Sequence, residues 1–138
     1  RGLAPDGILH TIEINDEMET FILKWLEKSG LSDKIKLHIG DAFETIPQIP
    51  EQFDLVFIDG EKDQYCDYYN LIFDKVKSGG FILAYNVLWS GKVVDENIPA
   101  KDHFTRGIIA FNKMVQDDDS IENLLLPAFD GLMIIRKK

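Results

Sequence analysis

Four side chains in this sequence are placed where they could do chemistry, because each lies at or just after a short apolar run typical of a β-strand. Glu13 lies near the end of ILHTIEI, and Asp59 follows FDLVFI. Lys62 comes soon after Asp59, and Asn86 follows FILAY. Ligands of α/β sheets bind beyond the carboxyl ends of parallel strands, so these four residues are the first candidates for a site.

Glu13 has the chemistry to bind a ribose. A carboxylate can accept hydrogen bonds from both hydroxyls of the sugar, and an acidic residue near a strand end is a common way of holding one. The alternative is an edge residue that points at solvent. The spacing by itself does not separate the two interpretations.

Asp59 and Asn86 together offer a carboxylate oxygen and an amide oxygen, which are the hard ligands that Mg²⁺ or Ca²⁺ prefers. The simpler alternative is that Asp59 caps the helix that begins near Lys62 and that Asn86 closes a turn, as these residue types often do. Spacing alone favours the simpler alternative.

Lys62 could act as a general base if burial or a nearby cation lowered its pKa into the working range, although most lysines are exposed and have no such role. His10 and His38 alternate with core positions inside predicted strands and are interpreted as structural. His103 lies in a predicted loop, where it could approach a substrate. Cys66 has no evident partner for nucleophilic chemistry.

Length and composition limit the kind of protein that carries these residues. A chain of 138 residues with 45% hydrophobic content predicts one domain with a sizeable core. The net charge of −9 argues against nucleic acid and anionic membranes as partners. One cysteine and no apolar run of membrane-spanning length indicate a cytoplasmic protein. The start at Arg1 suggests a piece of a longer chain.

The periodicity predicts an α/β fold in which mostly parallel strands alternate with helices. The third predicted strand is apolar enough to be buried on both faces. A turn at PAFDG predicts an antiparallel hairpin at the end of the chain. The predicted strands are 8–14, 35–39, 53–58, 81–84, 121–126 and 132–135, and the predicted helices are 16–29, 42–46, 64–77 and 104–115.

Five segments in unbroken order carry a family resemblance: LHTIEIND, KIKLHIGDAFETIP, FDLVFIDGEKDQY, GGFILAYNVLWSGKV and DGLMIIRKK. Together they resemble the cation-dependent O-methyltransferases, the family of catechol and caffeoyl-CoA O-methyltransferases. The resemblance covers nearly the whole chain. It implies a Rossmann-like methyltransferase sheet and methyl transfer from S-adenosylmethionine to a hydroxyl of a small catechol-like or phenol-like acceptor.

The resemblance also assigns roles to individual positions. Glu13 matches the residue that holds the ribose of S-adenosylmethionine, and Asp41 with Ala42 matches the turn beside the adenine. Asp59 matches a metal ligand that also lies near the methionine part of the cofactor.

Three further positions are implied on the acceptor side. Lys62 matches a lysine assigned as the general base, Asn86 matches a second metal ligand, and Trp89 would lie near the acceptor pocket. The implied cofactors are therefore S-adenosylmethionine and a divalent cation, Mg²⁺ or Ca²⁺.

Two departures from the family pattern stand out. Where the family usually has Asp-Asn, this chain has Tyr85-Asn86, and a neutral phenol is a poor ligand for Mg²⁺. The family's first strand and glycine-rich turn have no counterpart here, so the domain is interpreted as truncated.

Without that central strand, we expect strands 8–14 and 53–58 to pair directly or to contact a second molecule, as in a homodimer. We also expect the fragment to be impaired in cofactor binding. The alternative function is a non-catalytic, methyltransferase-like binding or interaction module with a decayed metal site.

Overall fold

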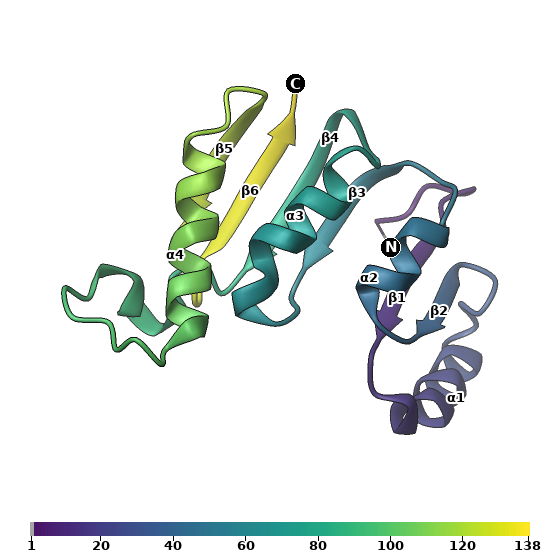
Figure 1. Ribbon diagram of the computed structural model, residues 1–138. Coiled ribbons are helices and arrows are strands. Elements are labelled where there is room, and N and C mark those ends of the chain that lie inside the picture. The colour runs from purple at the N-terminus through teal and green to yellow at the C-terminus, as the bar shows by residue number, and fades with distance from the viewer. Residues whose placement is uncertain (1) are drawn as a thin grey trace. The chain divides into compact units, whose positions relative to one another are not determined.

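The computed structural model describes residues 2–138, which form two compact units. One unit extends to Pro50 and the other is Glu51–Lys138, and each is described by itself. Figure 1 shows that both contain strands and helices, as the α/β prediction requires. No helix among residues 2–138 is long and apolar enough to cross a membrane.

The first unit is built on two parallel strands joined by a helix. Strand β1 (Leu9–Glu13) pairs with β2 (Ile35–Ile39), and Glu13 lies opposite Ile39. Between them lies α1 (Glu19–Ser29), preceded by the 3₁₀ turn η1 (Asp16–Met18). The unit closes with α2 (Ala42–Thr45) and η2 (Ile46–Gln48).

The ends of α1 follow from local chemistry. The Asn15 side chain accepts a hydrogen bond from the Glu17 N–H at the start of η1, and Gly30 ends α1 with a φ of 68°. That left-handed conformation costs glycine nothing, because it has no Cβ.

The second unit is a mixed four-stranded sheet in the order β3-β4-β6-β5. Strand β3 is parallel to β4, whereas β6 is antiparallel to both β4 and β5, which confirms the predicted C-terminal hairpin. Helices α3 and α4 lie over one face of this sheet (Figure 1). The elements are β3 (Phe53–Ile58), η3 (Lys62–Gln64), α3 (Tyr65–Phe73), β4 (Val76–Tyr85), η4 (Trp89–Val94), α4 (His103–Gln116), β5 (Ile121–Leu126) and β6 (Leu132–Lys137).

The core of the second unit lies between the sheet and its two helices. Alternate residues of β4 and β6 face the helices, and every third or fourth residue of α4 faces the sheet. The buried side chains include Ile82, Ala84, Met133, Ile135, Ile108, Phe111 and Val115. The opposite face of the sheet is more open. In β3, Leu55 is 56% and Phe57 is 57% exposed, so the prediction that strand 53–58 is buried on both faces was wrong.

Helix α3 ends earlier and β4 begins earlier than the sequence predicted. The predicted helix ran to Lys77, but α3 ends at Phe73 and Val76 already pairs with Phe53. Gly79 has a φ of 79° inside β4, next to a register shift between β3 and β4. Gly79 and Gly80 therefore lie at an irregularity within strand β4, and do not mark the end of a helix.

Strand β1 belongs to the two-stranded sheet of the first unit, and β3 is the edge strand of the four-stranded sheet of the second unit. The direct pairing of strands 8–14 and 53–58 expected from the sequence stays a prediction. The expected contact with a second molecule stays a prediction.

Candidate functional site

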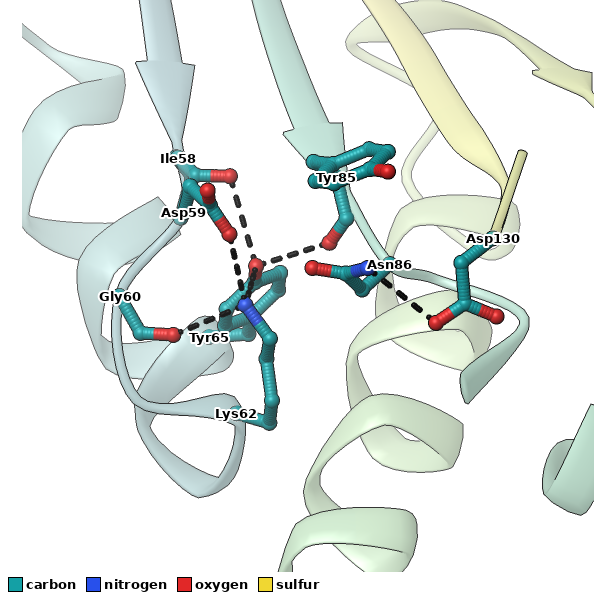
Figure 2. Close-up of polar contacts among 8 residues, drawn as sticks. All are labelled: Ile58, Asp59, Gly60, Lys62, Tyr65, Tyr85, Asn86 and Asp130. Carbon is teal, nitrogen blue, oxygen red and sulfur yellow. Dashed lines mark hydrogen bonds and ion pairs between the residues drawn. The ribbon is translucent and has the colours of Figure 1, made fainter. Parts of the chain in front are cut away.

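The ammonium of Lys62 is the centre of a polar cluster at the end of β3. It donates three hydrogen bonds: to Asp59 Oδ1 at 2.9 Å, to the Gly60 carbonyl at 3.1 Å and to Tyr65 Oη at 2.8 Å (Figure 2). The Lys62 side chain is only 11% exposed, whereas that of Asp59 is 47% exposed. An ammonium has three donors, so all of its hydrogen-bonding capacity is used inside the protein.

Tyr65 joins this cluster to the ends of two neighbouring strands. Its hydroxyl accepts from Lys62 and lies 2.8 Å from the Tyr85 carbonyl, to which it donates, with the Ile58 carbonyl further away at 3.4 Å. The side chain is fully buried, and its ring packs edge-on against Phe111. Burial raises the pKa of Tyr65 well above its usual value, and the nearby Asp59 carboxylate raises it further, so the hydroxyl keeps its proton.

The approach of α4 to η3 depends on Gly107. A Cβ at this position would lie 2.4 Å from Asp63 Cα and 2.6 Å from the Lys62 carbonyl oxygen. Only a residue without a side chain allows backbone contact this close. Gly107 therefore allows α4 to pack directly against the backbone of Lys62 and Asp63.

Asn86 is held by Asp130 from the loop between β5 and β6. Its Nδ2 donates to Asp130 Oδ2 at 3.2 Å, and the other carboxylate oxygen of Asp130 accepts from the Ser90 N–H at 2.5 Å. Figure 2 shows the amide oxygen of Asn86 pointing to the side of Lys62 and Tyr65. Asn86 has a φ of 59°, which asparagine tolerates better than most residues.

The structure decides between the alternatives left open for Asp59. It caps no helix: the residue at the start of η3 is Glu61, that of α3 is Gln64, and neither element has a side-chain cap. Asn86 does lie in a turn, because its carbonyl accepts from the Trp89 N–H.

Glu13 and Asp41 lie at the same edge of the first unit. The Gly40 N–H donates to the Glu13 carbonyl at 2.9 Å, which brings the turn after β2 next to the end of β1. The Glu13 carboxylate accepts from the Asn15 N–H through Oε1. Asp41 caps α2 by accepting from the Phe43 N–H, and Ala42 is the first residue of that helix.

The remaining candidates have structural surroundings. His10 and His38 stack on each other with ring nitrogens 3.1 Å apart, as expected of structural residues in paired strands. His103 begins α4, and was predicted to lie in a loop. Burial, and then the nearby Asp67, raises the pKa of the Cys66 thiol, which disfavours the reactive thiolate. Trp89 packs edge-on near Phe104.

Two residues of the cluster, Tyr65 and Asp130, were not among the sequence candidates. Tyr65 was interpreted only as part of an apolar helix face, and Asp130 only as a turn residue. The one available signal was the position of Asp130 next to Gly131 in a hairpin turn, which does not indicate a partner 44 residues away.

The residues present fit a divalent cation poorly. Of the three positions that resemble the family's metal ligands, Asp59 shares its carboxylate with an ammonium, Asn86 offers a neutral amide oxygen, and Tyr85 is a phenol whose ring stacks on Phe57. Within residues 2–138 no three histidine, cysteine or acidic side chains gather in a group that could hold a metal ion. The assignment of a metal to Asp59 and Asn86 stays a prediction.

A mixed sheet with helices on one face and polar residues at its strand ends defines an α/β protein of the Rossmann-like class. The O-methyltransferase family model matches residues 1–138, and the chain belongs to this family.

Individual relatives agree with the family assignment. The chain is 32% identical over 145 residues to caffeoyl-CoA O-methyltransferase 5 of Nicotiana tabacum, covering 98% of this chain and 60% of that protein. A methyltransferase of Podospora anserina, solved with S-adenosylhomocysteine bound, is 31% identical with a TM-score of 0.83 over 95% of this chain and 61% of that one.

An O-methyltransferase of Bacillus cereus, 24% identical, shares the fold with a TM-score of 0.91 over 100% of this chain and 66% of that one. These likenesses confirm the predicted Rossmann-like methyltransferase fold. The chain spans about 60% of the length of the curated relatives it matches.

Proposed function

We propose that the protein of which this chain forms part is an S-adenosylmethionine-dependent O-methyltransferase that methylates a hydroxyl of a small catechol-like or phenol-like acceptor. The observation that carries the proposal is the family match along all 138 residues. Relatives about 32% identical are named caffeoyl-CoA O-methyltransferases, and a solved relative holds the demethylated cofactor.

The first unit fits the nucleoside part of the cofactor. The Glu13 carboxylate accepts from the Asn15 N–H through Oε1, and its second oxygen is an acceptor suited to ribose hydroxyls. Gly40 has a φ of 137° in the turn before Asp41 and Ala42, a backbone conformation that glycine adopts most readily. When bound, the cofactor supplies a methyl group on a positively charged sulfur.

The second unit supplies the polar groups proposed to lie near the methionine part and the acceptor. Asp59 has a half-exposed carboxylate after the end of β3, where the family resemblance places the methionine part of the cofactor. Much of the rate in such a displacement comes from aligning the two reactants, which suits side chains held on strand ends and braced by a buried tyrosine. Lys62 as the general base stays a prediction, because in this conformation all of its donors are engaged.

The test is calorimetric titration of the full-length protein with S-adenosylmethionine. Glu13→Gln should weaken binding about tenfold or more, since a hydrogen bond to a charged group contributes about 1.5–3 kcal/mol. Glu17→Gln is the matched control, an exposed glutamate in η1 of the same unit. Mass spectrometry of caffeate-like and simple phenolic acceptors would then report transfer.

Absence of cofactor binding by the full-length protein would refute the proposal and would favour the non-catalytic binding module instead. The cytoplasmic location and the homodimer are proposed on the sequence alone. Light scattering of the purified full-length protein tests the dimer.

A further inference from the structure

The buried ammonium of Lys62 is paired with a carboxylate that the family resemblance makes a metal ligand. It lies against the one carboxylate among the three family-like ligand positions, at 2.9 Å from Asp59 Oδ1. The ion pair leaves Asp59 with little net negative charge to offer a second cation. A divalent ion bound to the same carboxylate would also be repelled by the ammonium.

The ammonium is held there by the fold. Tyr65 is fully buried, accepts from Lys62 and donates to the Tyr85 carbonyl, so it ties the lysine to the end of β4. Gly107 brings α4 against the backbone at Lys62. Moving the ammonium aside to admit a metal ion would break its three hydrogen bonds together.

The other two ligand positions do not make up for the shared carboxylate. Tyr85 follows the β4 alternation to the same face as Phe57, on which its ring stacks with centroids 6.4 Å apart. Asn86 contributes one neutral oxygen, and its nitrogen is bound to Asp130. Affinity for Mg²⁺ or Ca²⁺ rises with the number of carboxylate ligands, so this set is among the weakest.

We propose that methyl transfer by this protein does not depend on a divalent cation, because the three ligand positions offer one shared carboxylate, one neutral amide and one phenol. The proposal rests on the proposed function. It makes Lys62 a positioning residue that holds Asp59, and it removes the need for an acceptor with two adjacent oxygens, because no metal ion is there to chelate a diol.

The chemistry balances without a metal. The acceptor hydroxyl releases its proton to water, and its oxygen forms a bond to the methyl carbon while the carbon–sulfur bond breaks. The electron pair of that bond stays on sulfur, which becomes a neutral thioether.

The first experiment measures metal binding alone, with no turnover. Full-length protein, freed of metal by chelation, is titrated with Mn²⁺ and free Mn²⁺ is followed by electron paramagnetic resonance. We expect no saturable site tighter than about 1 mM. Tyr85→Asp should create one at least about tenfold tighter, because it restores a carboxylate ligand. Lys77→Met, which removes an exposed ion pair with Asp54, is the control and should change nothing.

The second experiment compares methyl transfer in EDTA with transfer in Mg²⁺, using acceptors with one phenolic hydroxyl and with two adjacent ones. We expect rates within about twofold in the two buffers, and turnover of the single phenol. Saturable Mn²⁺ binding to the unchanged protein in the micromolar range, or loss of activity in EDTA, overturns the proposal. Failure of Tyr85→Asp to bind Mn²⁺ overturns the assignment of Tyr85 as the missing ligand.

The two measurements keep this proposal separate from the proposed function. If the protein does not bind S-adenosylmethionine in the calorimeter, the methyltransferase assignment fails while the Mn²⁺ result still stands. If it binds the cofactor and also binds Mn²⁺ tightly, only the metal-independence fails.

Discussion

Tyr65→Phe is the most informative single change in this molecule, because it removes one oxygen atom that joins Lys62 to the end of β4. The phenyl ring can keep its packing against Phe111, so the change isolates the hydroxyl. Two hydrogen bonds are lost: the one from Lys62 at 2.8 Å and the one to the Tyr85 carbonyl at 2.8 Å.

The magnitude follows from the kind of bond lost. A hydrogen bond to a charged group contributes about 1.5–3 kcal/mol and one between neutral groups about 0.5–1.5 kcal/mol. The Lys62 side chain is largely buried and cannot turn freely to water, so we expect a loss of about 2–4 kcal/mol in the free energy of unfolding. With a urea slope of about 2 kcal/mol/M, the unfolding midpoint falls by about 1–2 M.

The assay is urea unfolding of the full-length protein followed by tryptophan fluorescence and circular dichroism. Tyr68→Phe is the matched control, because Tyr68 lies on the same helix and bonds through its hydroxyl to the Gln64 side chain at 2.8 Å. We expect the control to cost less than about 1 kcal/mol. If Tyr65→Phe lowers the free energy of unfolding no more than Tyr68→Phe does, the Tyr65 hydroxyl does not hold Lys62 in place.

Three other measurements test separate parts of the structure. Gly107→Ala should lower the free energy of unfolding by about 1–3 kcal/mol, because its Cβ would meet backbone atoms at 2.4 Å and 2.6 Å. Helix propensity alone would instead raise it by about 1 kcal/mol, so the direction in which the urea midpoint moves decides between the two effects. Asp130→Ala should speed hydrogen exchange of the Ser90 amide by about tenfold or more, because the carboxylate that accepts from it is gone. Hydrogen-exchange mass spectrometry measures this rate, with unchanged exchange in β5 as the internal control. An unchanged Ser90 rate would contradict the role given to Asp130. The pKa of Asp118 is lowered, first by its hydrogen bond from the Ser120 hydroxyl, although burial opposes the shift. A carboxyl whose folded pKa lies below its unfolded value stabilises the fold above about pH 4, and this contribution is lost as the pH falls through the folded pKa. Thermal melts between pH 2 and 6, a range set by that window, should therefore show a smaller fall in melting temperature on acidification for Asp118→Asn than for the unchanged protein. Equal falls in the two proteins would refute the assignment.

Much of the fold could be predicted because its elements carry local signals. The alternation at Ile35–Ile39 and Phe53–Ile58 and the spacing of Ile108, Phe111 and Val115 give strands and a helix where the structure has them. Boundaries failed where a local signal has two meanings. The predicted helix 64–77 ended just before Gly79, whereas the positive φ of Gly79 belongs to an irregularity inside β4.

The positions of the candidate residues at strand ends could be predicted from the sequence, but their contacts could not. Glu13, Asp59, Lys62 and Asn86 lie at strand ends, as the pattern of apolar runs indicates. What Lys62 binds could not be predicted, since its partner Tyr65 was indistinguishable from any other apolar helix residue. The contact between Asn86 and Asp130 joins residues 44 positions apart, which no local pattern encodes.

The sequence by itself determined the fold class, the family and the residues available for chemistry, because apolar periodicity and the order of short motifs are properties of the chain alone. Only the tertiary structure decided how those residues are used. Asp59 could cap a helix, bind a metal or pair with a lysine, and its spacing allowed all three. Asp59 pairs with Lys62 because α3 and α4 pack so that Tyr65 and Gly107 hold the lysine beside the Asp59 carboxylate.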